Sequence, residues 1–300
     1  MTEMKRRYQH MLYLFAACIL VVGCTPTSTT SVQLIGSGLT HPRSIAVSPE
    51  GTVYIADDDG KLFPEKGWLY EVSPTGVTRT IELGGLIPWS IATDAHGNIY
   101  ATMMPLLDNG IYKIDSLTGP KLLWTARYPK AIAVAANGDV YVIDALSIGD
   151  ERIVKLAPDG TTTVVASHLQ NTVALTVDRF NNLYVSDFSS ILMLRPDGQR
   201  DTIARSLCTA TAFASDSAGD LYVVDGGRWQ ILSLTIDGIG SKIGSGFKNP
   251  VGIAFDAQDN AYVIEGRNSA VKMFPISSVR QTTADLGRSC FANPLDYPDN

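Results

Sequence analysis

The sequence predicts an all-β protein, a six-bladed β-propeller of four-stranded antiparallel blades. Two observations predict this fold. A ten-residue pattern, of which "GDVYVIDALS" at residues 138–147 is one copy, occurs six times with a tyrosine at the same place. The intervals between successive tyrosines are 46, 41, 43, 38 and 40 residues, and such a period indicates an array of supersecondary units. The tyrosines are Tyr54, Tyr100, Tyr141, Tyr184, Tyr222 and Tyr262.

Each unit reads as four short strands. It begins with an apolar run such as "SIAVS" or "AIAVA", which is too short and too often interrupted for a helix. Three residues before each tyrosine stands a residue that tolerates positive φ, as a tight hairpin requires. These residues are Gly51, Gly97, Gly138, Asn181, Gly219 and Asp259. A second turn, such as "APDG" or "RPDG", joins the two outer strands. Six such units remove their exposed strand edges by closing into a ring.

Two segments compete to close this ring. The motif "IGSG" at residues 35–38 recurs at 243–246, so we expect residues 31–37 to complete the sixth blade with 251–279. The rival is "QTTADLGRSC" at 281–290, which resembles an outer strand and its turn. One of the two closes the ring and the other is an appendage. The expected boundaries are 32–279 for the propeller and 280–300 for a C-terminal tail.

The N-terminus is predicted to be a signal peptide, residues 1–23. Basic residues at 5–7 precede the apolar run "MLYLFAACILVV", whose twelve residues rise about 18 Å as a helix, too little to span a bilayer. The following "VVGC" resembles the bacterial lipobox, which implies cleavage before Cys24 and lipidation of it. The alternative is an ordinary signal peptide. Residues 24–31 are then a tether to the membrane, and Thr25 after the cysteine favours the outer membrane if the source is Gram-negative.

The net charge and the cysteine content indicate which binding partners and which disulfide the chain can have. The net charge of −6 excludes the basic footprint of a nucleic-acid binder, and loss of residues 1–23 makes the chain more acidic. Cys208 and Cys290 remain as one candidate disulfide in an oxidising compartment. We expect a monomer.

The pattern of an apolar strand followed by Gly-x-(Val/Leu/Ile)-Tyr-Val-x-Asp resembles the NHL-repeat family of six-bladed propellers, over about residues 40–276. That superfamily includes binding platforms, gluconolactonase-type hydrolases and lyases. The favoured expectation is a binding platform at the cell envelope for a protein, a glycan or a small ligand. The alternative is a divalent-metal-dependent hydrolase or lyase, and a structural subunit of an envelope complex is a third reading.

The ligand face is expected where loops lead into the innermost strands and follow the tyrosine strands. A basic and aromatic group there would suit an anionic or sugar-like ligand. Its candidates are Arg43, Trp89, Lys130, Arg228, Trp229 and Arg267. The competing interpretation is that these are ordinary solvated loop residues.

A divalent cation such as calcium is a weaker expectation. Carboxylates recur three residues after most of the tyrosines, and their oxygens could ligate a hard cation or accept hydrogen bonds from backbone amides. The weak metal candidates are Asp144, Asn171, Asp187, Asp225, Asn249 and Glu265. The gluconolactonase resemblance implies an acidic residue at the start of the first blade, but this chain has "THPRSIAV" there. No catalytic residue is assigned.

Overall fold

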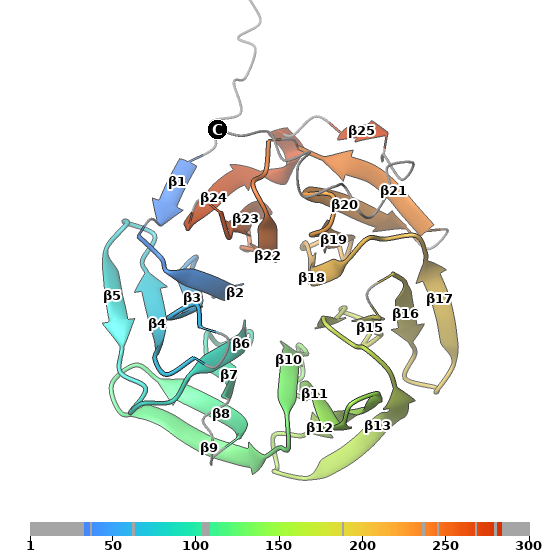
Figure 1. The fold of residues 1–300 in the computed structure, drawn as a ribbon, viewed down its shortest axis with the longest axis horizontal. Coiled ribbons are helices and arrows are strands. Elements are labelled where there is room, and N and C mark those ends of the chain that lie inside the picture. Colours follow the sequence, from blue (N-terminus) through green and yellow to red (C-terminus); the bar gives the residue numbers. More distant parts are fainter. Residues whose placement is uncertain are drawn as a thin grey trace, which may run out of the picture. The chain divides into compact units, whose positions relative to one another are not determined.

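The computed structural model describes residues 33–283, except positions 37, 62–63, 104–108, 188, 236–237, 245, 268 and 279–280. The described residues form six antiparallel sheets arranged as the blades of a β-propeller, which confirms the predicted fold class (Figure 1). The expected signal peptide, the tether and the tail beyond residue 283 lie outside the described residues. Within the described part, no helix has the length and hydropathy of a membrane span.

The first three blades each run outwards along the chain from an innermost strand. Blade 1 contains β2 (His41–Val47), β3 (Val53–Asp58), β4 (Gly67–Val72) and β5 (Thr78–Ile81). Blade 2 contains β6 (Pro88–Thr93), β7 (Ile99–Met103), β8 (Gly110–Asp115) and β9 (Gly119–Thr125). Blade 3 contains β10 (Pro129–Val134), β11 (Val140–Ser147), β12 (Asp150–Leu156) and β13 (Thr162–Leu169).

The last three blades repeat this order, with additions from the ends of the described chain. Blade 4 contains β14 (Leu175–Val177), β15 (Leu183–Ser186), β16 (Ile191–Leu194) and β17 (Arg200–Ala204). Blade 5 contains β18 (Ala210–Ser215), β19 (Leu221–Asp225), β20 (Gln230–Thr235), β21 (Gly238–Ile243) and the added β25 (Gln281–Thr283). Blade 6 contains β22 (Pro250–Phe255), β23 (Asn260–Glu265), β24 (Ala270–Pro275) and β1 (Gln33–Gly36), and a short 3-10 turn, η1 (Ile276–Ser278), follows β24.

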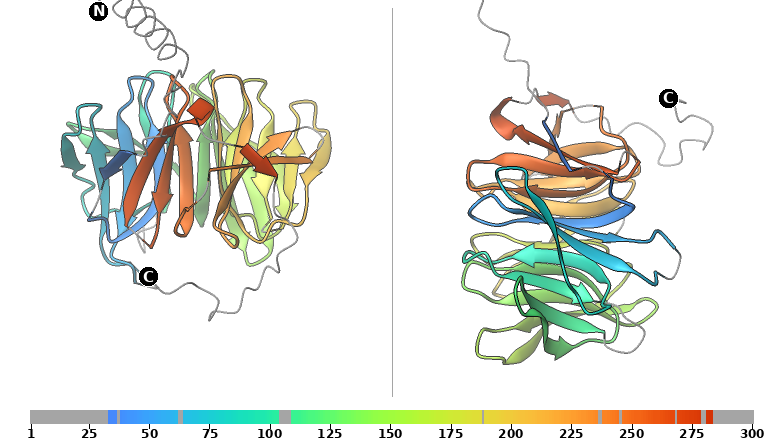
Figure 2. Two further views of the ribbon diagram at one scale, coloured as in Figure 1. Left: turned by 90° about the horizontal axis from the view of Figure 1, so that it is seen from above. Right: turned by 90° about the vertical axis from the view of Figure 1, so that its left-hand side faces the viewer.

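Blade 6 is completed by the N-terminal strand. β1 pairs antiparallel with β24, with Gln33 opposite Met273 and Gly36 opposite Val271. The rival segment instead adds β25 to the outer edge of blade 5, where Thr283 lies opposite Ser241. Both additions lie at the rim of the ring, on neighbouring blades (Figures 1 and 2). The "IGSG" repeat therefore identified the closing strand, and the C-terminal segment is the appendage.

The turn chemistry explains the innermost hairpins. All six positions predicted to need positive φ have it, from 58° at Asp259 to 89° at Gly219. In four blades the tyrosine hydroxyl also donates to an aspartate on this hairpin, for example from Tyr184 to Asp178 Oδ2 at 3.0 Å. Burial, assisted by that carboxylate, raises the pKa of Tyr184 to about 12.

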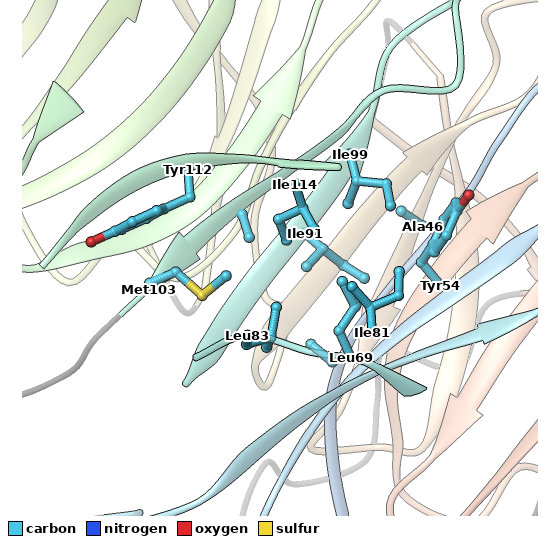
Figure 3. Close-up of a cluster of buried hydrophobic side chains, with 12 residues drawn as sticks. Ala46, Tyr54, Leu69, Ile81, Leu83, Ile91, Ile99, Met103, Tyr112 and Ile114 are labelled. Carbon is cyan, nitrogen blue, oxygen red and sulfur yellow. The ribbon is translucent and has the colours of Figure 1, made fainter. Parts of the chain in front are cut away.

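The apolar core lies between neighbouring blades. The cluster in Figure 3 joins Leu69 and Ile81 of blade 1 to Ile91 and Ile99 of blade 2, and Tyr54 packs at its side. All six repeated tyrosines are at most 8% exposed, so their repetition reflects this packing. The core thus holds the six innermost strands around one axis.

Candidate functional site

An axial cavity of about 350 Å³ lies among the first halves of the innermost strands. Its walls carry the cationic and aromatic side chains Arg43, Lys130 and Trp89 and the polar side chains His41, Ser44, Ser90 and Thr211. Three of the six predicted ligand-face residues, Arg43, Trp89 and Lys130, therefore come together here from blades 1, 2 and 3.

A β-bulge near the start of the innermost strands shapes the wall of the cavity. In blade 1, Pro42 lies opposite Asp57 and Ser44 opposite Ala56, so Arg43 is the extra residue. The same comparison makes Trp89 the extra residue in blade 2 and Thr211 in blade 5. A bulge re-aims the side chain it inserts, and these bulged residues all line the cavity.

Arg43 is held by two contacts. Its Nε donates to the Oδ2 atom of Asp58, and its guanidinium carbon lies 3.9 Å from the centroid of the Trp89 ring. The Asp58 side chain is fully buried, and its Oδ1 atom contacts His41 Nδ1 at 2.9 Å and accepts from Gly60 N–H at 2.8 Å. The His41 side chain remains 49% exposed. Asp58 thus orients both Arg43 and His41 in the wall of the axial cavity.

Lys130 is held in a similar way between blades 3 and 4. Its Nζ donates to Glu151 Oε1 and, at 3.2 Å, to the Thr172 carbonyl. Glu151 is 3% exposed, and its Oε2 atom accepts from the Thr172 backbone N–H at 2.6 Å and from the Thr172 hydroxyl. Glu151 therefore joins the cation to the loop that leads into β14.

The buried carboxylates Asp58 and Glu151 were missed by the sequence reasoning. Asp58 directly follows the repeated carboxylate position at Asp57, so strand alternation could have placed it on the other face of β3. Glu151 lies on β12, away from the repeated motif, and no local pattern in the sequence marks it.

The repeated carboxylates mainly hold loop backbone. Asp57 accepts from Thr40 N–H at 2.8 Å and from His41 N–H, and burial raises the pKa of its carboxyl above the usual range. Asp144 accepts from Arg127 N–H at 2.8 Å and Tyr128 N–H at 3.0 Å. Asp225 and Glu265 accept from loop amides of their own blades, at 3.3 Å from Cys208 N–H and 2.8 Å from Lys248 N–H. Asp187 instead accepts from Ser190 N–H at 2.8 Å.

These carboxylates do not assemble a cation site. Among the described residues, no three His, Cys, Asp or Glu side chains lie close enough to share a metal ion. The weak candidates Asn171 and Asn249 occupy left-handed positions, with φ of 54° and 55°, in loops that lead into the innermost strands. The oxygens of Asp58 and Glu151, nearest the cavity, already accept from cations, amides and a hydroxyl. The described side chains around the cavity thus do not form a site for a divalent cation.

The remaining candidates lie outside the axial cavity. Arg228 donates to Asp225 Oδ2 at 2.9 Å and to the Ser206 carbonyl at 3.0 Å, and its side chain is 6% exposed. The guanidinium carbon of Arg267 lies 4.9 Å from the centroid of the Trp229 ring. Cys208 is half-buried, whereas Cys24 and Cys290 lie outside the described residues, so both expectations for these cysteines stay predictions.

Comparison with known proteins relates the fold to solved enzymes and binding proteins. A gluconolactonase from Xanthomonas campestris superposes with a TM-score of 0.68 at 16% identity, covering 83% of this chain and 89% of that chain. Regucalcin from Agrobacterium tumefaciens, a calcium-binding protein, gives 0.66 at 14% identity, covering 87% and 98%. Virginiamycin B lyase from Staphylococcus aureus gives 0.55 at 16% identity, covering 79% and 95%. No protein-family model and no curated protein matches the chain. At these identities the likeness establishes one thing: the chain has the fold of the gluconolactonase-like and regucalcin-like propellers.

Proposed function

We propose that this protein is an exported lipoprotein whose NHL-type propeller binds a small ligand in its axial cavity. The convergence of Arg43, Trp89 and Lys130 on one concave site carries the proposal. Ligand sites are typically concave, with a few oriented polar groups over an apolar lining. Here buried carboxylates fix both cations before any ligand arrives, which lowers the entropy lost on binding.

Attachment to the membrane through a lipid on Cys24 is part of the same proposal. The lipobox-like "VVGC" supports lipidation of Cys24, and the polar residues that follow would tether the propeller to the membrane. For a Gram-negative source we propose the outer membrane.

Filling the cavity tests the ligand proposal. Val251 lines the cavity, so Val251→Trp should abolish binding of any ligand held there. The matched control is Val164→Trp on the outer strand of blade 3, where Val164 is 50% exposed. A chemically mixed set of small molecules is screened against the full-length protein by ligand-observed NMR. Ligands that bind the Val164→Trp and Val251→Trp proteins equally would exclude the axial cavity.

The second candidate is a hydrolase or lyase, as in two of the structural neighbours. The His41–Asp58 pair favours it, because a carboxylate on Nδ1 orients an imidazole as a general base. The described side chains around the cavity do not form a divalent-cation site, so the proposed hydrolysis uses no metal ion. The test is hydrolysis of small esters in chelator by wild type and by His41→Asn, whose amide can replace Nδ1 but cannot act as a base. Equal rates would exclude His41 as the base.

A further inference from the structure

The guanidinium of Arg43 has more donors than the protein uses. Its Nε is bonded to Asp58 and one face covers Trp89, which fixes the plane of the group. Within the described part of the chain, neither Nη atom has an acceptor, although the side chain is only 18% exposed. Arginine cannot lose its proton in a protein, so these N–H groups persist as donors beside the cavity.

Two hydroxyls and an ammonium add to this excess of donors. Ser44 Oγ accepts from Ile91 N–H at 3.1 Å and Ser90 Oγ accepts from Ile132 N–H at 3.4 Å, so each hydroxyl keeps its own proton to donate. Lys130 uses two of its three N–H groups, on Glu151 and the Thr172 carbonyl.

The two carboxylates beside the same wall are already engaged. Both oxygens of Asp58 and both oxygens of Glu151 accept from protein donors. A cation that took these oxygens as ligands would compete with Arg43 and Lys130, and these two side chains already balance the two carboxylates in charge. The cavity therefore offers free N–H and O–H donors to a ligand, whereas the carboxylate oxygens beside it, the ligands that a hard metal ion prefers, are already engaged.

Below this polar wall the cavity is apolar. One side chain from each blade lines both the axial cavity and a second cavity of about 210 Å³ further along the axis. These six are Ile45, Ile91, Ile132, Leu175, Phe213 and Ile253. They form the apolar waist that the two cavities share, and they can contact only an apolar part of a ligand favourably.

We infer that the axial cavity binds a small carboxylate with an apolar body, its oxygens on the Arg43 Nη groups and its body on the apolar waist. A carboxylate matches the planar fork of arginine and accepts up to about four hydrogen bonds, more than a hydroxyl or an amide can. This inference rests on the proposed function and names the ligand class for the same cavity.

The test is calorimetric titration of the full-length protein with hexanoate, hexanamide, glucose, gluconate and inorganic phosphate. Hexanamide matches hexanoate in shape and lacks the charge. Arg43→Lys keeps a cation for Asp58 and removes the Nη fork, so the fold is preserved while the proposed contact is lost. Lys248→Met is the control, because this exposed lysine precedes β22 and does not line the cavity.

We expect hexanoate to bind at least about tenfold more tightly than hexanamide, and Arg43→Lys to weaken hexanoate by about tenfold. Lys248→Met should change the affinity by less than about twofold, since the contact is local and the ion pairs cancel the long-range field. Equal binding of the acid and the amide, or no effect of Arg43→Lys, overturns the inference.

The remaining outcomes separate this inference from the proposed function. Binding of glucose or gluconate in preference to hexanoate would overturn the carboxylate assignment and leave a ligand-binding cavity. Phosphate binding as tightly as hexanoate would show a general anion site and overturn the apolar-body assignment. If none of the five probes binds, the inference fails, while the proposed function is decided separately by the broad screen with Val251→Trp.

Discussion

The ion pair between Lys130 and Glu151 offers the sharpest test of how the axial wall is held. Lys130→Met removes the cation, and Glu151, 3% exposed, would keep its bonds to Thr172 but lose its countercharge. Orphaning one partner of a fully buried pair costs about 3–5 kcal/mol. Because the Lys130 side chain is 35% exposed, water already weakens the pair, and we expect a loss of about 2 kcal/mol.

The assay is urea unfolding followed by circular dichroism. In the double variant Lys130→Met/Glu151→Gln the buried charge is gone and the amide oxygen still accepts from Thr172, so about half of the loss should return. The control Arg79→Gln breaks an exposed pair with Glu71, which water and salt screen, and should leave the urea midpoint almost unchanged. If Lys130→Met costs no more than Arg79→Gln, or if the second substitution lowers stability further, the proposed role of the buried charge is wrong.

Three further predictions concern other parts of the chain. Cys24→Ala should move the protein from the membrane pellet to the soluble fraction with an unchanged melting temperature, and membrane retention would refute the anchor. Removal of residues 24–38, which takes away β1, should expose the edge of β24 and cause a lower melting temperature and association in light scattering; removal of 24–31 alone should not. Because burial and a nearby aspartate raise the pKa values of Tyr100 and Tyr184 to about 12, the folded state keeps protons that the unfolded chain loses from pH 10. Stability should therefore be intact below pH 10 and fall between pH 10 and 12, and Tyr184→Phe should make that fall shallower; an identical slope would contradict the linkage.

The chemistry of the axial cavity depends on its side chains and not on the fold. Two structural neighbours are a gluconolactonase and a calcium-binding protein, yet the cavity wall here combines cations, hydroxyls and carboxylates already engaged in ion pairs. The loops and first residues of the innermost strands differ from blade to blade, whereas the hairpins and tyrosines repeat. The side chains that face the axis are thus specified separately from the hairpins and tyrosines that pack the blades.

Much of the fold follows from local chemistry that is visible in the amino-acid sequence. Positive φ at positions such as Gly219 and Asp259 follows from turn sterics, and the tyrosine period follows from packing that every blade repeats. The repeated "IGSG" even identified β1 as the closing strand, because equivalent edges in a ring use equivalent sequences. For the same reason Arg43, Trp89 and Lys130 could be placed on one face.

The tertiary structure alone decided which of these residues meet. Six strands from distant parts of the chain converge on one axis, so three candidates share a cavity while Arg228, Trp229 and Arg267 lie elsewhere. Strand alternation could have placed Asp58 on the other face of β3 from Asp57, but nothing local marks Glu151. The ion pairs that both carboxylates form depend on burial and on bulges that turn a neighbouring side chain toward the axis. The sequence thus determined the ring and its repeating core, and the closing of the ring determined the donor-rich cavity, because contacts across the axis have no local signature in the chain.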